Sequence, residues 1–596
     1  MNENFEHINL LCQNFQKILL KQHEAFLLLV KKMKDFNNLM LFDQKKTEKI
    51  IDSWVNLVFD DCDKLSNKAL DLNSKFTNSF QNFLLPQANN WHNNQTNNKN
   101  TTNFQNIFEN FYHNKSYFDF FNENYSIIKN FSSELIESLE LEDESKKYAN
   151  FYLNNLIQFL DPKNNFFLNQ EVVKKSLETK FENVIDGLEN FINDLQNSDT
   201  IFNINNLNSS LFKIGENIAA TEGKVIFQND LCQLIYYKPK KQVYNTPIFI
   251  LPPCVNKYYI LDLSKNNSFV EWLVENNFEV FLVSFVNPDS SHSHLNFEDY
   301  INFSVIETTD YLKTIGYDKF SAIGYCIGGT LLACGISYLT KKNKNPFVSA
   351  CFLATVLDFE DAGDISLMMN GEMIEKIKNT VFNAGYIDGK IINHWFNVLK
   401  SKDTFWKFFV NNYLLGKKPL ELDIAYWNSD SINLTSSMYI GYLESMYVNN
   451  ALKNGKLEIL GTKINLKDID IPTFFLATKD DHISPPNSVF MSANEFKDSK
   501  KTLCLGLSGH VAGVVNHPNK QKYGYYEIKN FKKENNKTEA ELSDLVPGSW
   551  WNYYKNWQIE NLENKSLVSS KPYDKVSYIE NAPGFYVKRK VVENSK

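Results

Sequence analysis

The sequence of 596 residues lacks an apolar run long enough to cross a membrane as a helix. Its longest uninterrupted apolar runs, such as Ala25–Val30, fall well short of the roughly 20 residues that a bilayer requires. The first residues, MNENFEHINLL, also lack the basic-then-apolar order of a secretory signal peptide. We therefore expect a soluble cytoplasmic protein with no transmembrane segment.

Cysteine is scarce and scattered along the chain. None of the cysteines forms a CxxC pair or a Cys/His spacing typical of zinc ligands. The scatter also argues against a disulfide framework, so we expect reduced thiols and neither a metal nor another resident cofactor. The eight residues are Cys12, Cys62, Cys232, Cys254, Cys326, Cys334, Cys351 and Cys504.

Basic residues are not gathered into one tract, and the formal net charge is −8. Nucleic-acid binding normally requires a concentrated positive surface, so this charge pattern argues against a nucleic-acid partner. Aromatic residues, in contrast, are abundant. The 47 Phe and 29 Tyr supply enough apolar area for a large core and more than one domain.

The N-terminal third of the chain has a helical pattern. In residues 1–86, apolar residues recur at three- and four-residue spacing, which predicts amphipathic helices that pack on their neighbours or bind a partner or a lipid-like surface. Residues 87–103 form an Asn-rich polar segment, which we interpret as a linker. Residues 104–208 return to helical periodicity and predict a helical N-terminal domain.

From residue 209 onward, short apolar runs alternate with helical stretches. This alternation is typical of an α/β fold with a mostly parallel sheet, so we expect one such domain over residues 209–596. The predicted strands are Val225–Tyr237, Thr246–Pro253, Phe278–Phe285, Asp318–Tyr325, Val348–Asp358, Thr473–Ala477 and Thr502–Leu507.

Over a hundred residues separate the strand that ends at Asp358 from the strand that begins near Ile471. A strand-to-helix connection needs only a few loop residues, so we predict an inserted subdomain at about 360–470. Its position suits a cap over an active site; the alternative is a helical subdomain with no gating role. The insertion is dense in aromatic residues: Trp395, Phe396, Phe405, Trp406, Phe408, Phe409, Tyr413, Tyr426, Trp427, Tyr439, Tyr442 and Tyr447.

The stretch Ser321–Thr330, SAIGYCIGGT, has the pattern of a nucleophile elbow with Cys326 in place of serine. Such an elbow places the nucleophile on a cramped turn between a strand and a helix, so the residues two before and two after it must be small. Gly324 and Gly328 meet this requirement. A sulfur beside a helix N-terminus is favoured as thiolate. The alternative is a buried structural cysteine in a glycine-rich turn.

A cysteine nucleophile needs a base and usually a group that orients the base. Among ten histidines, His510 follows the predicted strand Thr502–Leu507 on a glycine-containing turn, where a catalytic base would lie. Asp480 and Asp481 follow an earlier strand and Asp358 ends another, so all three are candidate acids. Nucleophile, acid and base then occur in the chain order of the α/β-hydrolases.

Two backbone N–H groups are the predicted oxyanion donors. One belongs to Ile327, directly after the nucleophile, and the other to the loop after the strand Thr246–Pro253. Because the two prolines of this loop cannot donate, Cys254 or Val255 is the candidate. The choice of cysteine over serine favours acyl transfer from a thioester. Exchange of one thioester for another has a free-energy change close to zero, so the acyl group can leave again, whereas a lower-energy serine ester favours hydrolysis.

At these residues the chain resembles the class I polyhydroxyalkanoate synthases of the α/β-hydrolase superfamily. The similarity covers roughly residues 150–590, and residues 1–150 show little of it. It includes the stretches PPCVNKYYILDL, FEVFLVSFVNPD, GYCIGG, VNNYLLGKKP, AYWNSDSINL, ATKDDHISPP and LSGHVAGVVN.

The resemblance implies that Cys326 carries the growing acyl chain as a thioester and that His510 deprotonates Cys326. Asp481 would orient His510 or help to activate the incoming hydroxyl. It implies an enzyme that polymerises (R)-3-hydroxyacyl-CoA, such as (R)-3-hydroxybutyryl-CoA, into polyhydroxyalkanoate with release of coenzyme A. It also implies an α/β-hydrolase domain with a cap, a homodimer, and association with cytoplasmic polyester granules and granule-associated proteins.

Two other functions fit parts of the sequence. A cysteine-dependent thioesterase or polyester depolymerase of the same fold would release free acid instead of making polymer. A non-catalytic granule-coating protein would use only the helical N-terminal part. The ordered Cys–Asp–His set argues against this last function for the whole chain.

Overall fold

The computed structural model describes residues 115–197, 211–369, 371–381, 384–393, 405–418, 422–497, 501–534 and 537–590, with isolated positions before residue 80. The predicted helices of residues 1–86 and the predicted linker 87–103 lie almost wholly outside these residues and stay predictions. Contacts divide the chain into two compact units. The first comprises Met1–Asn206 and Phe396–Leu420, and the second comprises Leu207–Trp395 and Glu421–Lys596.

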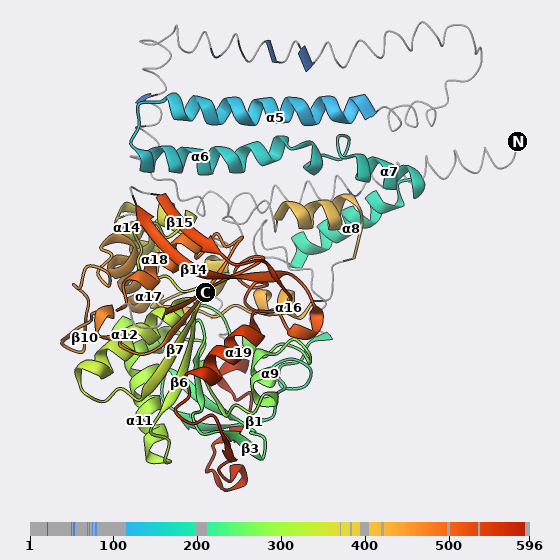
Figure 1. The fold of residues 1–596 in the computed structure, drawn as a ribbon. Helices are drawn as coiled ribbons and strands as arrows, with labels where there is room; N and C mark the ends of the chain where they lie inside the picture. Colours follow the sequence, from blue (N-terminus) through green and yellow to red (C-terminus); the bar gives the residue numbers. More distant parts are fainter. Residues whose placement is uncertain are drawn as a thin grey trace, which may run out of the picture. The chain divides into compact units, whose positions relative to one another are not determined.

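A twelve-stranded sheet forms the centre of the second unit in the described part of the chain (Figure 1). Its order is β15-β14-β13-β12-β7-β6-β4-β5-β2-β1-β18, and β16 pairs with β14. The strands are β1 (Gly223–Gln228), β2 (Cys232–Tyr237), β4 (Ile248–Leu251), β5 (Val280–Phe285), β6 (Phe320–Tyr325), β7 (Phe347–Leu353), β12 (Thr473–Thr478), β13 (Lys501–Gly506), β14 (Gly524–Glu534), β15 (Lys537–Leu542), β16 (Val546–Pro547) and β18 (Glu580–Asn581).

The six central strands, from β13 to β5, run parallel. β6 and β12 are buried along their whole length, as expected of strands that helices cover on both faces. Antiparallel strands extend the sheet at both edges. The predicted α/β fold with a mostly parallel sheet is therefore confirmed, and each of the six central strands overlaps a predicted one.

The predicted strand Val225–Tyr237 is wrong in one respect, because this segment is a hairpin of two antiparallel strands, β1 and β2. Asn229 makes the turn between them. Its side-chain oxygen accepts hydrogen bonds from the N–H groups of Leu231 and Cys232. An asparagine that binds the backbone just ahead of it is a common turn former, so the sequence did carry a signal for this turn.

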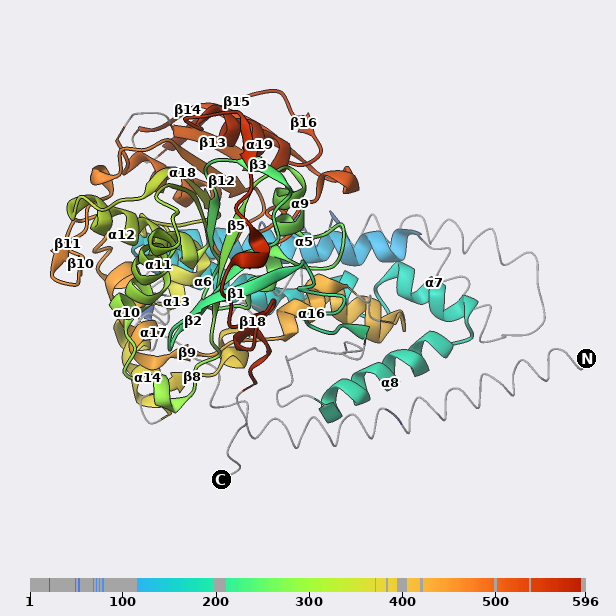
Figure 2. The same ribbon diagram turned by 90° about the horizontal axis from the view of Figure 1, so that it is seen from below.

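Helices cover both faces of the sheet (Figure 1 and Figure 2). On one face lie α9 (Phe269–Glu275) and α19 (Trp551–Glu560), where the rings of Phe269 and Trp551 pack with centroids 4.7 Å apart. On the other face lie α11 (Glu307–Thr314), α12 (Ile327–Lys341) and α18 (Pro486–Asn494). The strands are thereby fixed, and so are the loops that leave their carboxyl ends.

The chain between β7 and β12 forms the predicted insertion, and its described parts are mainly helical. They contain α13 (Asp364–Met368), α14 (Gly371–Val381), α16 (Asp423–Ser429), α17 (Ser436–Tyr442), the π-helix η9 (Leu443–Val448) and the strand pairs β8 (Tyr386–Ile387) with β9 (Leu434–Thr435) and β10 (Glu458–Ile459) with β11 (Thr462–Lys463). Elsewhere in this unit lie β3 (Gln242–Tyr244) with β17 (Leu567–Ser569), the short helix η4 (Tyr258–Leu261), α10 (Phe297–Ile301) and the π-helix η6 (Asn302–Ile306).

The first unit is helical in its described residues. It contains α5 (Lys115–Ser138), α6 (Asp143–Ile157), η1 (Gln158–Leu160), η2 (Pro162–Asn164), α7 (Gln170–Glu178), α8 (Glu182–Asn197) and the π-helix η8 (Phe409–Leu414). The segment 405–418 therefore packs with the N-terminal helices, although the sequence analysis assigned it to the cap.

Contacts between α8 and η8 explain this packing. A Cβ on Gly187 would lie only 2.0 Å from the carbonyl oxygen of Tyr413, so glycine permits a close approach. The hydroxyl of Tyr413 donates to the buried Asp194 carboxylate at 2.5 Å. Burial raises the pKa of Asp194 to about 6, although the hydrogen bond from Tyr413 lowers it.

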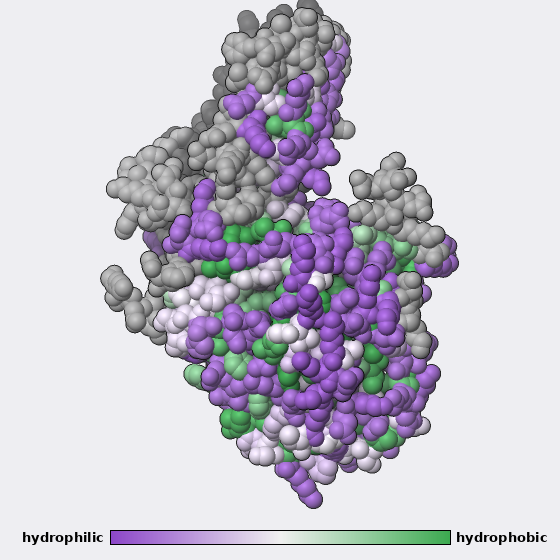
Figure 3. Space-filling model, turned by 90° about the vertical axis from the view of Figure 1, so that its left-hand side faces the viewer, coloured by the Kyte–Doolittle hydropathy of each residue, from purple (hydrophilic) through white to green (hydrophobic). Residues whose placement is uncertain are grey.

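The face of the molecule drawn in Figure 3 is mostly hydrophilic, with hydrophobic residues in small scattered groups. Such a distribution is usual for a globular protein. Within the residues that the structure describes, no helix combines the length and the apolar character needed to cross a membrane.

Candidate active site

Cys326 lies at the sharp turn between β6 and α12. Its backbone angles are φ 53° and ψ −127°, which an L-residue adopts only when its surroundings constrain it. Its N–H donates to the carbonyl oxygen of Leu353 on β7 at 2.9 Å, and its side chain is a half-buried free thiol. Because Ile327 begins α12, the first N–H groups of the helix surround this turn without acceptors inside the helix.

Three glycines around this turn stand where a side chain would collide. A Cβ on Gly324 would lie 2.5 Å from the Cα of Gly329, and one on Gly328 would lie 2.4 Å from the carbonyl oxygen of Pro252. The predicted need for small residues two before and two after the cysteine is confirmed. A Cβ on Gly329 would lie 2.1 Å from Oγ1 of Thr355, a contact that the sequence analysis missed.

His510 and Asp481 form a buried hydrogen-bonded pair. Nδ1 of His510 lies 2.7 Å from Oδ2 of Asp481. The same oxygen accepts a hydrogen bond from the hydroxyl of Thr478 at 2.9 Å, and the other oxygen accepts from the N–H groups of Ile483 and Ser484, each at 2.9 Å. With four donors around it, the carboxylate has a fixed orientation and therefore holds the imidazole ring in one position.

The charge of Cys326 also acts on His510, because it contributes to the raised pKa of the imidazole. Tyr325, directly before the cysteine, also holds the histidine. Its hydroxyl donates to the carbonyl oxygen of His510 at 3.0 Å, and the two rings stack with centroids 5.5 Å apart. The ends of β6, β12 and β13 thus bring together Cys326, Asp481 and His510, the three side chains selected from the sequence.

The charges in this trio follow from burial and from mutual contact. Burial by itself lowers the pKa of His510, but Asp481 and Cys326 outweigh it and raise that pKa to about 10. Burial by itself raises the pKa of Asp481, but His510 and two backbone N–H donors hold it below its usual range. The pair therefore favours an imidazolium beside a carboxylate, the state that a histidine reaches after it takes a proton from a thiol.

The other two candidate acids lie elsewhere. Asp480 is exposed, and its backbone N–H donates to the carbonyl oxygen of Ser508 at 3.0 Å. Asp358 is buried after β7, where its carboxylate lies 2.7 Å from Nζ of Lys453 and accepts a hydrogen bond from Asn450. Of the three aspartates, Asp481 is the one whose side chain contacts the histidine.

The loop after β4 brings Cys254 to the same turn. Cys254 is buried, and both burial and the charge of Cys326 raise the pKa of its thiol. It therefore stays a neutral thiol, which leaves Cys326 as the sulfur that His510 can activate. The backbone of Cys254 and the N-terminus of α12 at Ile327 both adjoin this turn, where the two oxyanion donors were predicted. Among the described residues, no cluster of three or more acidic, His or Cys side chains has the form of a metal site.

Comparison with known proteins identifies the family. Over 475 residues the chain is 34% identical to the "Poly(3-hydroxyalkanoate) polymerase subunit PhaC" of Rhizobium meliloti (strain 1021), and the alignment covers 79% of this chain and 77% of the relative. The chain belongs to the poly(3-hydroxyalkanoate) polymerase family. The relative of the same name in Cupriavidus necator is 32% identical over 470 residues, which cover 77% of this chain and 78% of that one.

Residues 104–273 match the family described as "Poly-beta-hydroxybutyrate polymerase (PhaC) N-terminus". This match corrects the sequence analysis, which set the start of the similarity near residue 150. The polymerase pattern therefore includes the helical region before the α/β fold. Among solved structures, a monoacylglycerol lipase from Paleococcus ferrophilus is 12% identical with a TM-score of 0.30, over 47% of this chain and 91% of that one.

In this member of the polymerase family, the insertion supplies two tyrosines near the nucleophile. The hydroxyls of Tyr442 and Tyr447 both interact electrostatically with the Cys326 sulfur, and burial raises the pKa of each. Their rings pack together with centroids 5.9 Å apart, and Phe359 packs on Tyr447 at 5.0 Å. In the sequence, both tyrosines stand out only as part of an aromatic-rich stretch, because residue spacing does not show which part of an insertion folds back onto the elbow.

The insertion also holds the loop that carries Cys254. Nζ of Lys257 lies 2.9 Å from Oδ1 of Asp430 at the end of α16, and the lysine side chain is only 2% exposed. The hydroxyl of Tyr259 donates to the same carboxylate at 2.8 Å, and Nε1 of Trp427 donates to the carbonyl oxygen of Lys257 at 2.7 Å. Burial lowers the pKa of Lys257, and Asp430 opposes this shift. These contacts fix the loop beside the elbow.

Proposed function

We propose that this chain is a class I polyhydroxyalkanoate synthase. It polymerises (R)-3-hydroxyacyl-CoA, with (R)-3-hydroxybutyryl-CoA as the expected substrate, and releases coenzyme A. The observation that carries the proposal is the hydrogen bond between His510 and Asp481, in a chain of the polymerase family where the charge of Cys326 also raises the pKa of His510. The relatives named above bear the name poly(3-hydroxyalkanoate) polymerase.

Loading of the enzyme begins at the cysteine. Nε2 of His510 takes the thiol proton of Cys326, and the sulfur attacks the thioester carbonyl of the substrate. The N–H groups of Ile327 and Cys254 stabilise the oxyanion that forms. The bond to the coenzyme A sulfur then breaks, and the imidazolium gives its proton to that sulfur. Coenzyme A leaves as a thiol, and the acyl group stays on Cys326 as a thioester.

Elongation joins a hydroxyl to a thioester carbonyl. The hydroxyl oxygen of one 3-hydroxyacyl unit attacks the carbonyl of another, an ester C–O bond forms, and the C–S bond breaks. The hydroxyl proton passes through the base to the sulfur that is released. Because an ester lies lower in energy than a thioester, each such step favours polymer. The four hydrogen bonds that fix Asp481 support a role for it in orienting His510.

The proposal extends to the domain organisation. Residues 1–86 form an N-terminal helical region, 87–103 a linker, 104–208 a helical domain, and 209–596 the catalytic domain with a cap at about 360–470. The proximity of Tyr442 and Tyr447 to Cys326 supports the cap. Residues 396–420 are the exception, because they pack with the N-terminal helices.

We further propose a cytoplasmic homodimer that works at the surface of a polyester granule, together with granule-associated proteins. The enzyme uses no resident metal or cofactor and no nucleic acid, since the chemistry needs only the cysteine, its base and a substrate that carries its own leaving group. Support for the granule and the dimer comes from the family resemblance of the motifs around the elbow and the histidine loop.

The first experiment measures coenzyme A release from (R)-3-hydroxybutyryl-CoA by the wild-type protein and by Cys326→Ala, with the product sized by chromatography. We expect coenzyme A release with polymer formation, and loss of both in the variant. Release with only free 3-hydroxybutyrate would instead identify a thioesterase. Polymer formation by Cys326→Ala would exclude Cys326 as the acyl carrier.

A further inference from the structure

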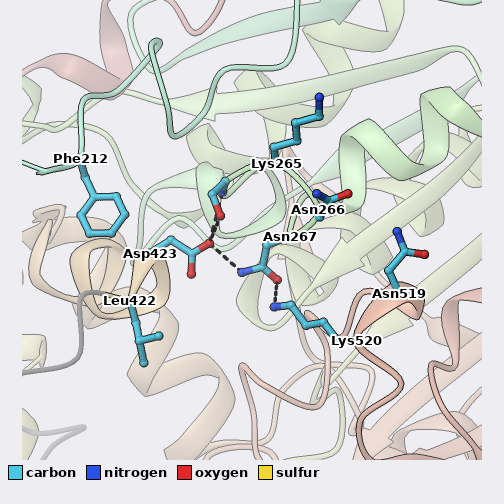
Figure 4. A pocket seen from close by; sticks show the side chains of 9 residues that line it. Phe212, Lys265, Asn266, Asn267, Leu422, Asp423, Asn519 and Lys520 are labelled. Atoms are coloured by element: carbon cyan, nitrogen blue, oxygen red, sulfur yellow. Dashed lines mark hydrogen bonds between the residues drawn. The ribbon is translucent and has the colours of Figure 1, made fainter.

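A polar cavity lies in the α/β unit, and its lining does not include Cys326, Asp481 or His510. It has a volume of about 580 Å³, which is within the range of small-molecule sites. Four segments form it: the chain at Phe212 before β1, the loop after η4, the start of α16, and the chain that follows the histidine loop (Figure 4). Its lining residues are Phe212, Ser264, Lys265, Asn266, Asn267, Leu422, Asp423, Asn519 and Lys520.

The lining carries a net positive charge, although the chain as a whole is negative. The charged side chains of the lining are those of Lys265, Lys520 and Asp423. Neutral donors already surround this carboxylate: Asn267 donates to it at 2.8 Å, Ser264 donates through its hydroxyl and N–H, and the N–H of Ile424 donates at 2.8 Å. Among the described residues, neither Lys265 nor Lys520 forms an ion pair, so the single carboxylate of Asp423 leaves the lining with an excess of one positive charge.

Hydrogen bonds hold the polar side chains of the cavity lining in fixed positions. Asn267 is 4% exposed, and it donates to Asp423 while its oxygen accepts from Nζ of Lys520. This chain of hydrogen bonds positions the Lys520 ammonium at the wall of the cavity (Figure 4). Burial and the nearby Lys522 lower the pKa of Lys520, while Asp423 opposes them. A bound anion would supply the paired counter-charge that the Lys520 ammonium lacks.

Opposite the lysines and asparagines, Phe212 and Leu422 form an apolar side (Figure 4). An aromatic ring beside cationic and amide groups suits a ligand that has both a planar ring and a phosphate, because the ring stacks and the phosphate meets the ammonium groups. Nucleotides have this composition.

We propose that this cavity binds the phosphorylated adenosine end of the coenzyme A thioester. The inference rests on the proposed function, since it assigns a subsite to its substrate. Two of the four cavity segments continue along the chain from the candidate active site, because Ser264 follows the Cys254 loop and Lys520 follows the His510 loop. Coenzyme A carries its nucleotide at the far end of a long flexible arm from the thioester, so a nucleotide site apart from Cys326 is what its structure requires.

Two variants and one control test the proposal. Lys520→Gln removes one ammonium group, and Asn266→Asp adds a negative charge at nearly equal size. Asn266 has a φ of 62°, a conformation that aspartate also tolerates. Lys575→Gln removes an exposed lysine outside the cavity and serves as the control. Binding of adenosine 3′,5′-bisphosphate is measured by calorimetry without turnover, so this arm works even if the chain makes no polymer.

We expect Lys520→Gln and Asn266→Asp each to weaken adenosine 3′,5′-bisphosphate binding by about tenfold, the effect of one lost charge-assisted contact. The preference for (R)-3-hydroxybutyryl-CoA over the corresponding pantetheine thioester, measured as a ratio of kcat/KM values, should fall by a similar factor. Lys575→Gln should change neither. Weaker bisphosphate binding with an unchanged preference would mean that the cavity binds a free nucleotide, and this would overturn the proposal, as would unchanged binding.

Discussion

Nζ of Lys257 lies 2.9 Å from Oδ1 of Asp430, and this buried pair ties the loop after β4 to the end of α16. Asp430→Asn keeps the shape of the side chain but leaves the Lys257 ammonium buried without a counter-charge. We expect a loss of about 3 kcal/mol in the free energy of unfolding, as is typical of a broken buried pair. We also expect kcat to fall by about tenfold or more, because the Cys254 N–H moves relative to the elbow.

Thermal unfolding and steady-state kinetics of coenzyme A release measure the two effects. Glu563→Gln is the matched control, because its partner Lys319 is exposed and such surface pairs contribute little. Loss of stability with an unchanged kcat would show that the buried pair supports the fold but does not position the oxyanion donor.

Tyr325→Phe removes the hydrogen bond to the carbonyl oxygen of His510 and keeps the ring stacked on the imidazole. We expect a destabilisation of about 1 kcal/mol and a several-fold lower kcat with little change in KM, because the histidine loop is held less firmly. Tyr554→Phe, which loses a long 3.4 Å bond to Gln558 on α19, is the control. Equal kinetics in the two variants would argue against a positioning role for Tyr325.

The His510–Asp481 pair gives the stability a distinct pH dependence. His510 has a raised pKa in the folded protein, so its contribution is complete below its unfolded pKa of about 6.5 and is lost as the pH rises towards about 10. Asp481 has a lowered pKa, so its contribution is present above about 3.9, its unfolded value, and is lost on further acidification. The pair therefore stabilises the fold most between these two unfolded values.

Asp481→Asn removes this stabilisation, so its melting temperature should lie furthest below that of the wild type at mildly acidic pH, and the gap should narrow towards pH 10. Scanning calorimetry over a pH series measures the gap. Asp480→Asn, which changes an exposed neighbour, should show a small gap that does not depend on pH. A gap of constant size for Asp481→Asn would mean that the pair is not ionised.

Gly329→Ala should destabilise the elbow, because the new methyl group would lie 2.1 Å from Oγ1 of Thr355. Overpacking of this kind costs about 2 kcal/mol. Adding Thr355→Ala should restore part of the loss, since it removes the two closest atoms. Gly441→Ala is the control, because its nearest neighbour would be 3.8 Å away. Urea unfolding of the wild type, the single variants Gly329→Ala and Thr355→Ala and the double variant gives the coupling, and simple additivity would contradict the collision.

Local patterns in the sequence predicted the elbow and the strands well. The glycines flanking Cys326 are a steric requirement of the turn itself, and each central strand is an apolar run bounded by turn residues, so neighbouring residues carry the signal. The chain order of a nucleophile, an acid and a base could be predicted for the same reason, because each candidate residue follows directly after its own strand.

Contacts between segments that are distant in the chain could not be predicted from the sequence. Nothing in the local pattern favoured Asp481 over Asp480 or Asp358 until the family resemblance was considered, because all three follow strands and only the folded sheet sets the distance to His510. It assigned 405–418 to the cap, whereas close packing at Gly187 joins this segment to α8.

The sequence by itself therefore determined the α/β class, and it predicted Cys326 as nucleophile, His510 as base and an insertion after the elbow, because these depend on local pattern and chain order. The tertiary structure alone decided which insertion residues lie near Cys326, that Lys257 and Asp430 fix the Cys254 loop, and that a cationic cavity forms between four separate segments. Burial and charge act through space, so residues that are distant in the chain acquire these properties only when the fold brings them together.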